Sequence, residues 1–275
     1  MSNGISFGQY YPADSLLHRL DPRTKVLMTV LYIVCTFLCR SLLSFAVLAA
    51  SAIVLVAISR IPIRMILSSL RPILFIIVFT SLINVFMTRG EQLLTPPEWK
   101  IKIYAEGIWT AFFMILRIST LIIGTSVFLT YTTTPIALTD ALEALLSPLK
   151  KIKIPVHDFA MMMTIALRFI PTLSEETRKI MNAQKARGAD FTSGSLLRRA
   201  KALIPILVPL FVSAFNRAFE LAAAMECRCY HGGEGRTRLK VLRFRAVDFV
   251  MLVLLVGVGV GLVFLNRNGL GYAMK

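Results

Sequence analysis

Apolar residues occur in long runs along this chain, and short polar or basic segments separate the runs. Five runs approach the roughly 20 apolar residues that a helix needs to cross a bilayer. They cover residues 26–38, 42–58, 73–86, 108–130 and 247–266. The pattern predicts an all-α integral membrane protein with about five transmembrane helices.

Local signals mark where these runs begin and end. Asp21 and Pro22 precede the first run, where they suit an N-cap and a first helical residue. The segment 59–72 is basic and contains proline, so it predicts a turn. The segment 88–107 is polar and also contains proline, so it predicts a loop.

Lysine and arginine in the connecting segments predict the orientation, because cytoplasmic loops of membrane proteins are enriched in these residues. The flank before the first run and the segment 59–72 are basic, whereas glutamates balance the basic residues of 89–106. We therefore expect a cytoplasmic N-terminus, an external loop at 89–106, a return to the cytoplasm near Thr132 and an external C-terminus.

The middle of the chain is too charged for spans and too apolar for an ordinary soluble domain. Helical patterns begin at Thr134 and Pro135 and again after Pro155, where the second one ends before Gly188. A third pattern covers 193–230. These patterns predict long amphipathic helices at the cytoplasmic membrane surface. The predicted domains are a four-span membrane domain (1–133), a cytoplasmic or interfacial helical region (134–245) and a final span with the C-terminus (246–275).

Charge and composition narrow the range of partners. Hydrophobic residues make up 56% of the 275 residues, and the formal net charge is +16. A soluble protein this basic would suggest nucleic-acid binding, but no basic stripe with interleaved aromatic residues lies outside the loops. We therefore expect a lipid bilayer as partner, in the cell membrane, and no nucleic acid.

Motifs for catalysis, cofactors and metals are not recognisable in the sequence. No G-x-x-x-x-G-K-[ST] phosphate loop occurs, so we expect no ATPase site in this chain. Cys35 and Cys39 suit helix packing. Cys227 and Cys229 lack a second ligand pair at zinc spacing. We expect no cofactor and no metal, and the apolar cores of the runs offer no acidic proton relay.

One charged residue lies near the middle of the fourth run. The cost of burying Arg117 makes it a functional candidate. Alternatively, it faces the helix bundle and bonds to backbone carbonyls or to polar neighbours such as Asn84 or Thr120.

Two helical patterns end alike, in "NAQKARGADF" at 182–191 and "AAMECRCYHGG" at 223–233. Each ending places one arginine, Arg187 or Arg228, between two small residues. A cation at a helix C-terminus interacts favourably with the helix dipole and stabilises the helix by about 0.3–1 kcal/mol. Arginine is also common among interface hot spots, and small neighbours let it reach into a partner's pocket. Both interpretations remain open on composition alone.

Three longer stretches carry a resemblance to a known family. "LHRLDPRTKVL" near the start, the run "TTTPIALTDALEALLSPLKKIKIPVHDFAMMMTIALRFIPTLSEETRKIMNAQKARGADF" and "AMECRCYHGGEGRTRLK" resemble the T component of energy-coupling factor transporters. The resemblance implies two coupling helices, each ending in an Ala-Arg-Gly tip that docks on one ABC-type ATPase subunit. It also implies a membrane-embedded S subunit that binds a vitamin or metal ion.

The docking residues follow from this resemblance position by position. The first tip is Ala186, Arg187 and Gly188, as in the family. The second keeps Arg228 but has Cys227 and Cys229 where the family has Ala and Gly. We also expect an interface of the coupling helices that contains Pro171, Met181, Pro205 and Pro209, with kinks at the prolines.

Two other functions compete with this one. The permease of a conventional ABC importer meets its ATPase through one loop with a pattern like E-A-A-x-x-x-G, which "ELAAAMECRC" resembles only loosely. That loop would need one arginine tip, not two. A membrane scaffold or enzyme has only the amphipathic helices in its favour.

Overall fold

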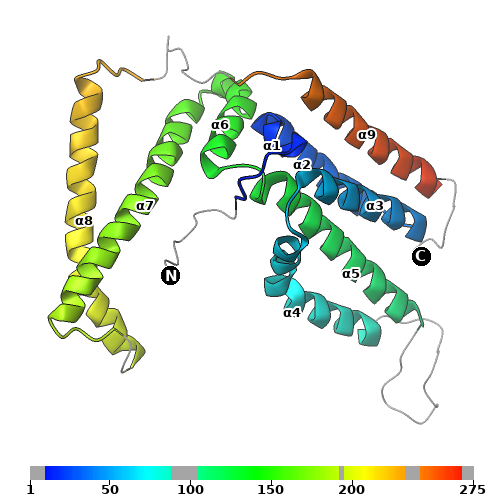
Figure 1. Ribbon diagram of the computed structural model, residues 1–275, viewed down its shortest axis with the longest axis horizontal. Helices are drawn as coiled ribbons and strands as arrows, with labels where there is room; N and C mark the ends of the chain where they lie inside the picture. The colour runs from blue at the N-terminus through cyan, green and yellow to red at the C-terminus, as the bar shows by residue number, and fades with distance from the viewer. Residues whose placement is uncertain (1–9, 88–104, 192–194, 233–241, 268–275) are drawn as a thin grey trace. The chain divides into compact units, whose positions relative to one another are not determined.

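The computed structural model describes residues 10–87, 105–191, 195–232 and 242–267, and Figure 1 shows the helices that they form. Within these ranges every regular element is helical, which confirms the all-α prediction. The elements are α1 (Leu16–Arg19), α2 (Pro22–Leu38), α3 (Leu42–Ser59), α4 (Ile63–Met87), α5 (Ala105–Thr125), a π-helical turn η1 (Ser126–Thr130), α6 (Pro135–Leu145), a 3₁₀ turn η2 (Ser147–Ile152), α7 (Val156–Ala186), α8 (Leu196–Glu226) and α9 (Ala246–Arg267).

The chain folds as two compact units, which we describe separately. The first contains Met1–Ala141 and Val241–Lys275, and the second contains Leu142–Lys240. The chain therefore leaves the first unit within α6 and returns to it before α9.

Helices α2, α3, α5 and α9 pack around a common core in the first unit, and α4 packs against α5. The largest fully buried side chains of this core include Tyr32, Phe45, Phe128 and Tyr131. Tyr32 approaches α5 closely, since a Cβ built on Gly124 would lie 2.1 Å from the Tyr32 ring. Its hydroxyl donates to the Thr120 carbonyl (3.2 Å). The absence of a side chain at Gly124 thus lets α2 and α5 come together.

Predicted helix starts agree with the structure at two places. Asp21 is the N-cap of α2, accepting from the Arg23 amide (2.9 Å), and Pro22 is its first residue. The Thr134 hydroxyl accepts from the Ala137 amide (3.3 Å) at the start of α6.

Five helices of the described chain are long and apolar enough to cross a membrane, which confirms the predicted number. Judged by length and composition alone, the set differs from the prediction in one place. The five are α3, α4, α5, α8 and α9. Helix α2 has 17 residues, or about 26 Å at 1.5 Å per residue, which is at the lower end of the length range for a transmembrane helix. Helix α8 is among the five because its body is apolar between charged ends.

The predicted basic turn at 59–72 is wrong beyond Pro62. Arg60 ends α3 in the left-handed conformation (φ 55°), and α4 already begins at Ile63. Pro72 lies inside α4 without ending it. Membrane helices tolerate such prolines because neighbouring groups satisfy the freed backbone carbonyl. The predicted loop at 88–107 lies mostly outside the described residues.

Helices α7 and α8 make up most of the second unit and pack against one another. They run in opposite directions, so their C-terminal ends lie at opposite ends of the pair (Figure 1). An ion pair joins them, with the Arg217 guanidinium 2.8 Å from the Glu176 carboxylate. A second contact links α6 to the first turn of α7, where His157 Nδ1 lies 2.9 Å from Glu143 Oε1.

Candidate functional site

A specific hydrogen-bond pattern ends α7 and places Arg187 at the junction with the following loop. The amide of Gly188 donates to the Lys185 carbonyl (2.9 Å), and the amide of Ala189 donates to the Gln184 carbonyl (3.0 Å). Gly188 is left-handed, with φ 86°. This combination is a Schellman motif, which satisfies carbonyls that a helix leaves free at its C-terminus.

Helix α8 ends in the same motif. The amide of Cys229 donates to the Glu226 carbonyl (2.9 Å), and the amide of Tyr230 donates to the Met225 carbonyl (3.1 Å). Cys229 is left-handed, with φ 55°. Arg228 therefore occupies the position that Arg187 has in the first motif, directly before the left-handed residue.

The two tips differ in the residue that adopts the left-handed conformation. In an L-residue other than glycine, Cβ crowds the following carbonyl, and this conformation costs about 1–2 kcal/mol. Glycine avoids this cost at position 188, whereas Cys229 bears it. Cys229 thus departs from the Ala-Arg-Gly pattern in residue type but keeps its left-handed backbone and a small side chain.

All six residues of the two tips are exposed, including both arginine side chains. Neither guanidinium forms a hydrogen bond or ion pair with another described residue. Each is therefore exposed to a second molecule at the end of a long helix. The tips Ala186-Arg187-Gly188 and Cys227-Arg228-Cys229 are brought to equivalent positions on two crossed helices, not to one shared pocket.

The contact between α7 and α8 uses residues that the sequence analysis missed. Arg217 reaches across to Glu176, and its Nε donates to the Ser213 hydroxyl on its own helix (3.5 Å). A hydrogen bond from Ser213 and the charge of Arg217 hold the pKa of Glu176 below its usual range. Arg217 in an otherwise apolar stretch was the available signal, but Glu176 lies among other charged residues, and nothing in the sequence paired the two.

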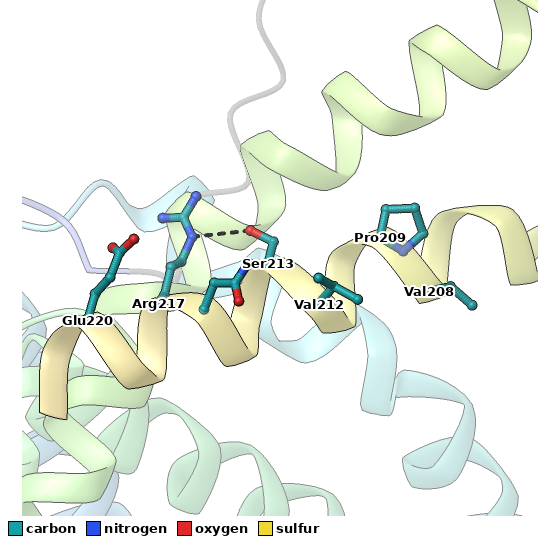
Figure 2. A pocket seen from close by; sticks show the side chains of 7 residues that line it. Val208, Pro209, Val212, Ser213, Arg217 and Glu220 are labelled. Carbon is teal, nitrogen blue, oxygen red and sulfur yellow. Dashed lines mark hydrogen bonds between the residues drawn. The ribbon is translucent and has the colours of Figure 1, made fainter. Parts of the chain in front are cut away.

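An open groove runs along α8 beside this ion pair, and Figure 2 shows its side chains. It is lined by Val208, Pro209, Val212, Ser213, Asn216, Arg217 and Glu220. Of the residues predicted for the coupling-helix interface, only Pro209 lines the groove. Met181 is half-buried, and Pro171, Pro205 and Pro209 are exposed. Both helices continue through their prolines.

The remaining candidate residues belong to packing in the described structure. Cys35 and Cys39 are buried free thiols within the helix core. The Arg117 guanidinium donates to the Cys39 carbonyl (3.1 Å) and lies over the Phe45 ring, 5.5 Å from its centroid. Arg117 thus bonds to a backbone carbonyl, as the second alternative predicted. Within the described residues no group of three histidine, cysteine or acidic side chains could hold a metal ion.

Comparison with known proteins identifies relatives over most of the chain. A family model described as "Cobalt transport protein" matches residues 13–239. The chain is 53% identical over 252 residues to the energy-coupling factor transporter transmembrane protein EcfT of Ruminiclostridium cellulolyticum, covering 91% of this chain and 93% of that protein. It is 47% identical over 266 residues to the EcfT of Bacillus subtilis, covering 97% of this chain and all of that protein.

These relatives and the five apolar helices make this a multi-pass protein of the cell membrane and a transmembrane component of a transporter complex. They also favour the energy-coupling component over the permease of a conventional ABC importer. By the match of the family model and the identity to these relatives, the chain belongs to the family of energy-coupling factor transporter transmembrane proteins.

Proposed function

We propose that α7 and α8 transmit the ATP-driven motion of two ABC-type ATPase subunits to a membrane-embedded S subunit that binds a vitamin or another micronutrient. Each arginine tip docks in a groove of one ATPase subunit. The protein itself hydrolyses no ATP, and the substrate is selected by the S subunit. The helical region 134–245 lies on the cytoplasmic side, between the four-span domain 1–133 and the final span 246–275.

The observation that carries this proposal is the equivalence of the two helix ends. Arg187 and Arg228 occupy the same position in two Schellman motifs, and both are exposed. A helix-dipole role alone does not require two crossed helices to present the same three-residue geometry. Two equal docking points suit a partner made of two similar subunits, each offering an acceptor-lined pocket to an arginine fork.

The ion pair between Glu176 and Arg217 supports a mechanical role. It joins α7 to α8 through residues that each precede the tip arginine of their own helix, Glu176 before Arg187 and Arg217 before Arg228, so a displacement of one helix is passed to the other.

Affinity purification of this protein from its own membranes tests the proposal. We expect two cassette ATPases and one small, very apolar membrane protein to co-purify, and ATPase activity to follow the cassette subunits. The purified protein freed of those partners should hydrolyse no ATP. Co-purification of a single ATPase with no small membrane subunit would instead support a conventional importer.

A further inference from the structure

Three charged residues are buried together in the first unit, at the cytoplasmic ends predicted for α2 and α9. Asp21, Lys25 and Asp248 are each exposed by 6% or less. Burying a charge is costly unless it is bonded and balanced. Since a packed apolar cluster would stabilise the fold equally well, these charges are best explained by a specific geometry that they impose. We call Asp21, Lys25 and Asp248 the anchor cluster.

Lys25 holds the chain where it leaves the membrane domain. Its Nζ donates to the Thr132 carbonyl (2.7 Å) and to the His18 carbonyl (3.2 Å). Thr132 directly follows the π-helical turn η1 and Tyr131, whose amide closes that turn through the Ser126 carbonyl (2.9 Å). π-Helical turns are rare and occur often at functional positions. The exit toward the coupling helices is thus fixed by a buried ammonium group.

Asp248 holds the chain where it returns. One carboxylate oxygen accepts from the Asp21 amide (2.7 Å), and the other accepts from the Arg245 amide (2.7 Å). Arg245 is the last residue of the segment 134–245. Asp21 and Asp248 also attract the Lys25 ammonium electrostatically. One cluster therefore binds both ends of the segment that contains α7 and α8, through residues far apart in the sequence.

We propose that Lys25 and Asp248 are positioning residues that hold both ends of the coupling segment on the membrane domain, so that motion of α7 and α8 reaches the membrane subunits. This inference rests on the proposed function. Without the bonds of the anchor cluster, the two ends of the coupling segment are no longer held on the membrane domain. ATP hydrolysis then continues while transport falls.

The test uses the complete complex in membrane vesicles, with Lys25→Met and Asp248→Asn, both close to the parent side chains in size. ATP hydrolysis is measured together with uptake of whichever probe the parent accumulates from a panel of Co²⁺, riboflavin, folate and biotin. We expect assembly and ATP hydrolysis within about twofold of the parent. Uptake per ATP should fall about tenfold or more, within the range of typical coupling effects.

Two further variants separate positioning from general stability. Thr36→Val removes a fully buried hydroxyl that bonds only within α2, and it should leave uptake per ATP unchanged. The double variant Lys25→Met with Asp248→Asn removes a positive and a negative charge together. It should remain uncoupled, because the bonds and not the charge balance hold the two ends.

Hydrogen exchange at single amides tests the anchor cluster locally. In the Asp248→Asn complex, the amide of Asp21 or Arg245 loses its acceptor, and its exchange should accelerate. Parental uptake per ATP in both single variants, recovery in the double variant, or failure of both single variants to assemble would each overturn the proposal. If Arg187→Ala still disrupts ATPase binding in that case, the anchor is refuted and the docking function is not.

Discussion

Replacement of Cys229 by glycine tests whether the second tip really stores backbone strain. The left-handed conformation costs cysteine about 1–2 kcal/mol relative to glycine. Glycine also adds conformational freedom to the unfolded chain, which offsets about 0.4–1 kcal/mol of the stabilisation. Cys229 is exposed, so little packing is lost. We therefore expect Cys229→Gly to stabilise the end of α8 by about 0.5–1 kcal/mol.

Hydrogen exchange at the amide of Tyr230 measures this effect directly, because that amide closes the motif on the Met225 carbonyl. A gain of about 0.5–1 kcal/mol slows exchange about two- to fivefold. Cys227→Gly is the matched control. Cys227 has helical dihedral angles (φ −58°, ψ −23°), where glycine is unfavourable, so exchange should accelerate. If Cys229→Gly accelerates exchange, or if the two variants act alike, the strain argument is wrong.

Three further predictions follow from other parts of the structure. Gly124→Ala should destabilise the membrane domain by about 1–3 kcal/mol, because its Cβ would overlap the Tyr32 ring; parental thermal stability of the purified variant would contradict this packing. Since the folded-state pKa of Glu176 is lowered, its stabilisation of the α7–α8 contact is present above the ordinary pKa and is lost as pH falls through the lowered value; α7 exchange in Glu176→Gln should lack that pH dependence. Cysteine labelling should find Ser193 and Lys275, both outside the described residues, on opposite sides of the membrane.

Local features were predictable from the sequence because they depend on neighbouring residues. Asp21 and Pro22 begin α2, and Gly188 ends α7, where the local chemistry predicts a start or a stop. The existence of the two arginine tips was predictable for the same reason. The left-handed Cys229 was not, since cysteine gives no signal for that conformation.

Contacts between distant residues were not predictable in the same way. Glu176 and Arg217 are 41 positions apart, and Asp21 and Asp248 are 227 apart. A single sequence gives their types but not their pairing. Asp248 also escaped notice because it stands at the edge of an apolar run, where an acid looks like an ordinary polar flank. The structure shows that it is buried and bonded.

The membrane spans were only partly predictable from the sequence. Hydropathy predicted the number of candidate spans, but by length and composition α8 qualifies and the 17-residue α2 does not. Neither property reports what a helix packs against. Helix α2 buries Thr24, Lys25, Thr29 and Thr36 against its neighbours. Helix α8 exposes most of its apolar side chains in this single chain. The proposed cytoplasmic position of α8 requires a partner subunit or the membrane surface to cover them.

The affinity of the purified protein, held in lipid nanodiscs, for the pair of cassette ATPases tests the docking of the two tips most directly. Arg187→Ala and Arg228→Ala should each cost about 2–4 kcal/mol, a loss of roughly thirtyfold to a thousandfold, because truncation leaves acceptors in the partner's pocket unpaired. Arg→Lys at either tip should recover only part of this loss, since lysine lacks the planar fork. Lys185→Ala, which removes an exposed charge in the last turn of α7, should cost less than about 1 kcal/mol. If both tip variants bind the ATPases as tightly as the parent, the two arginines only cap their helices and the docking assignment is refuted.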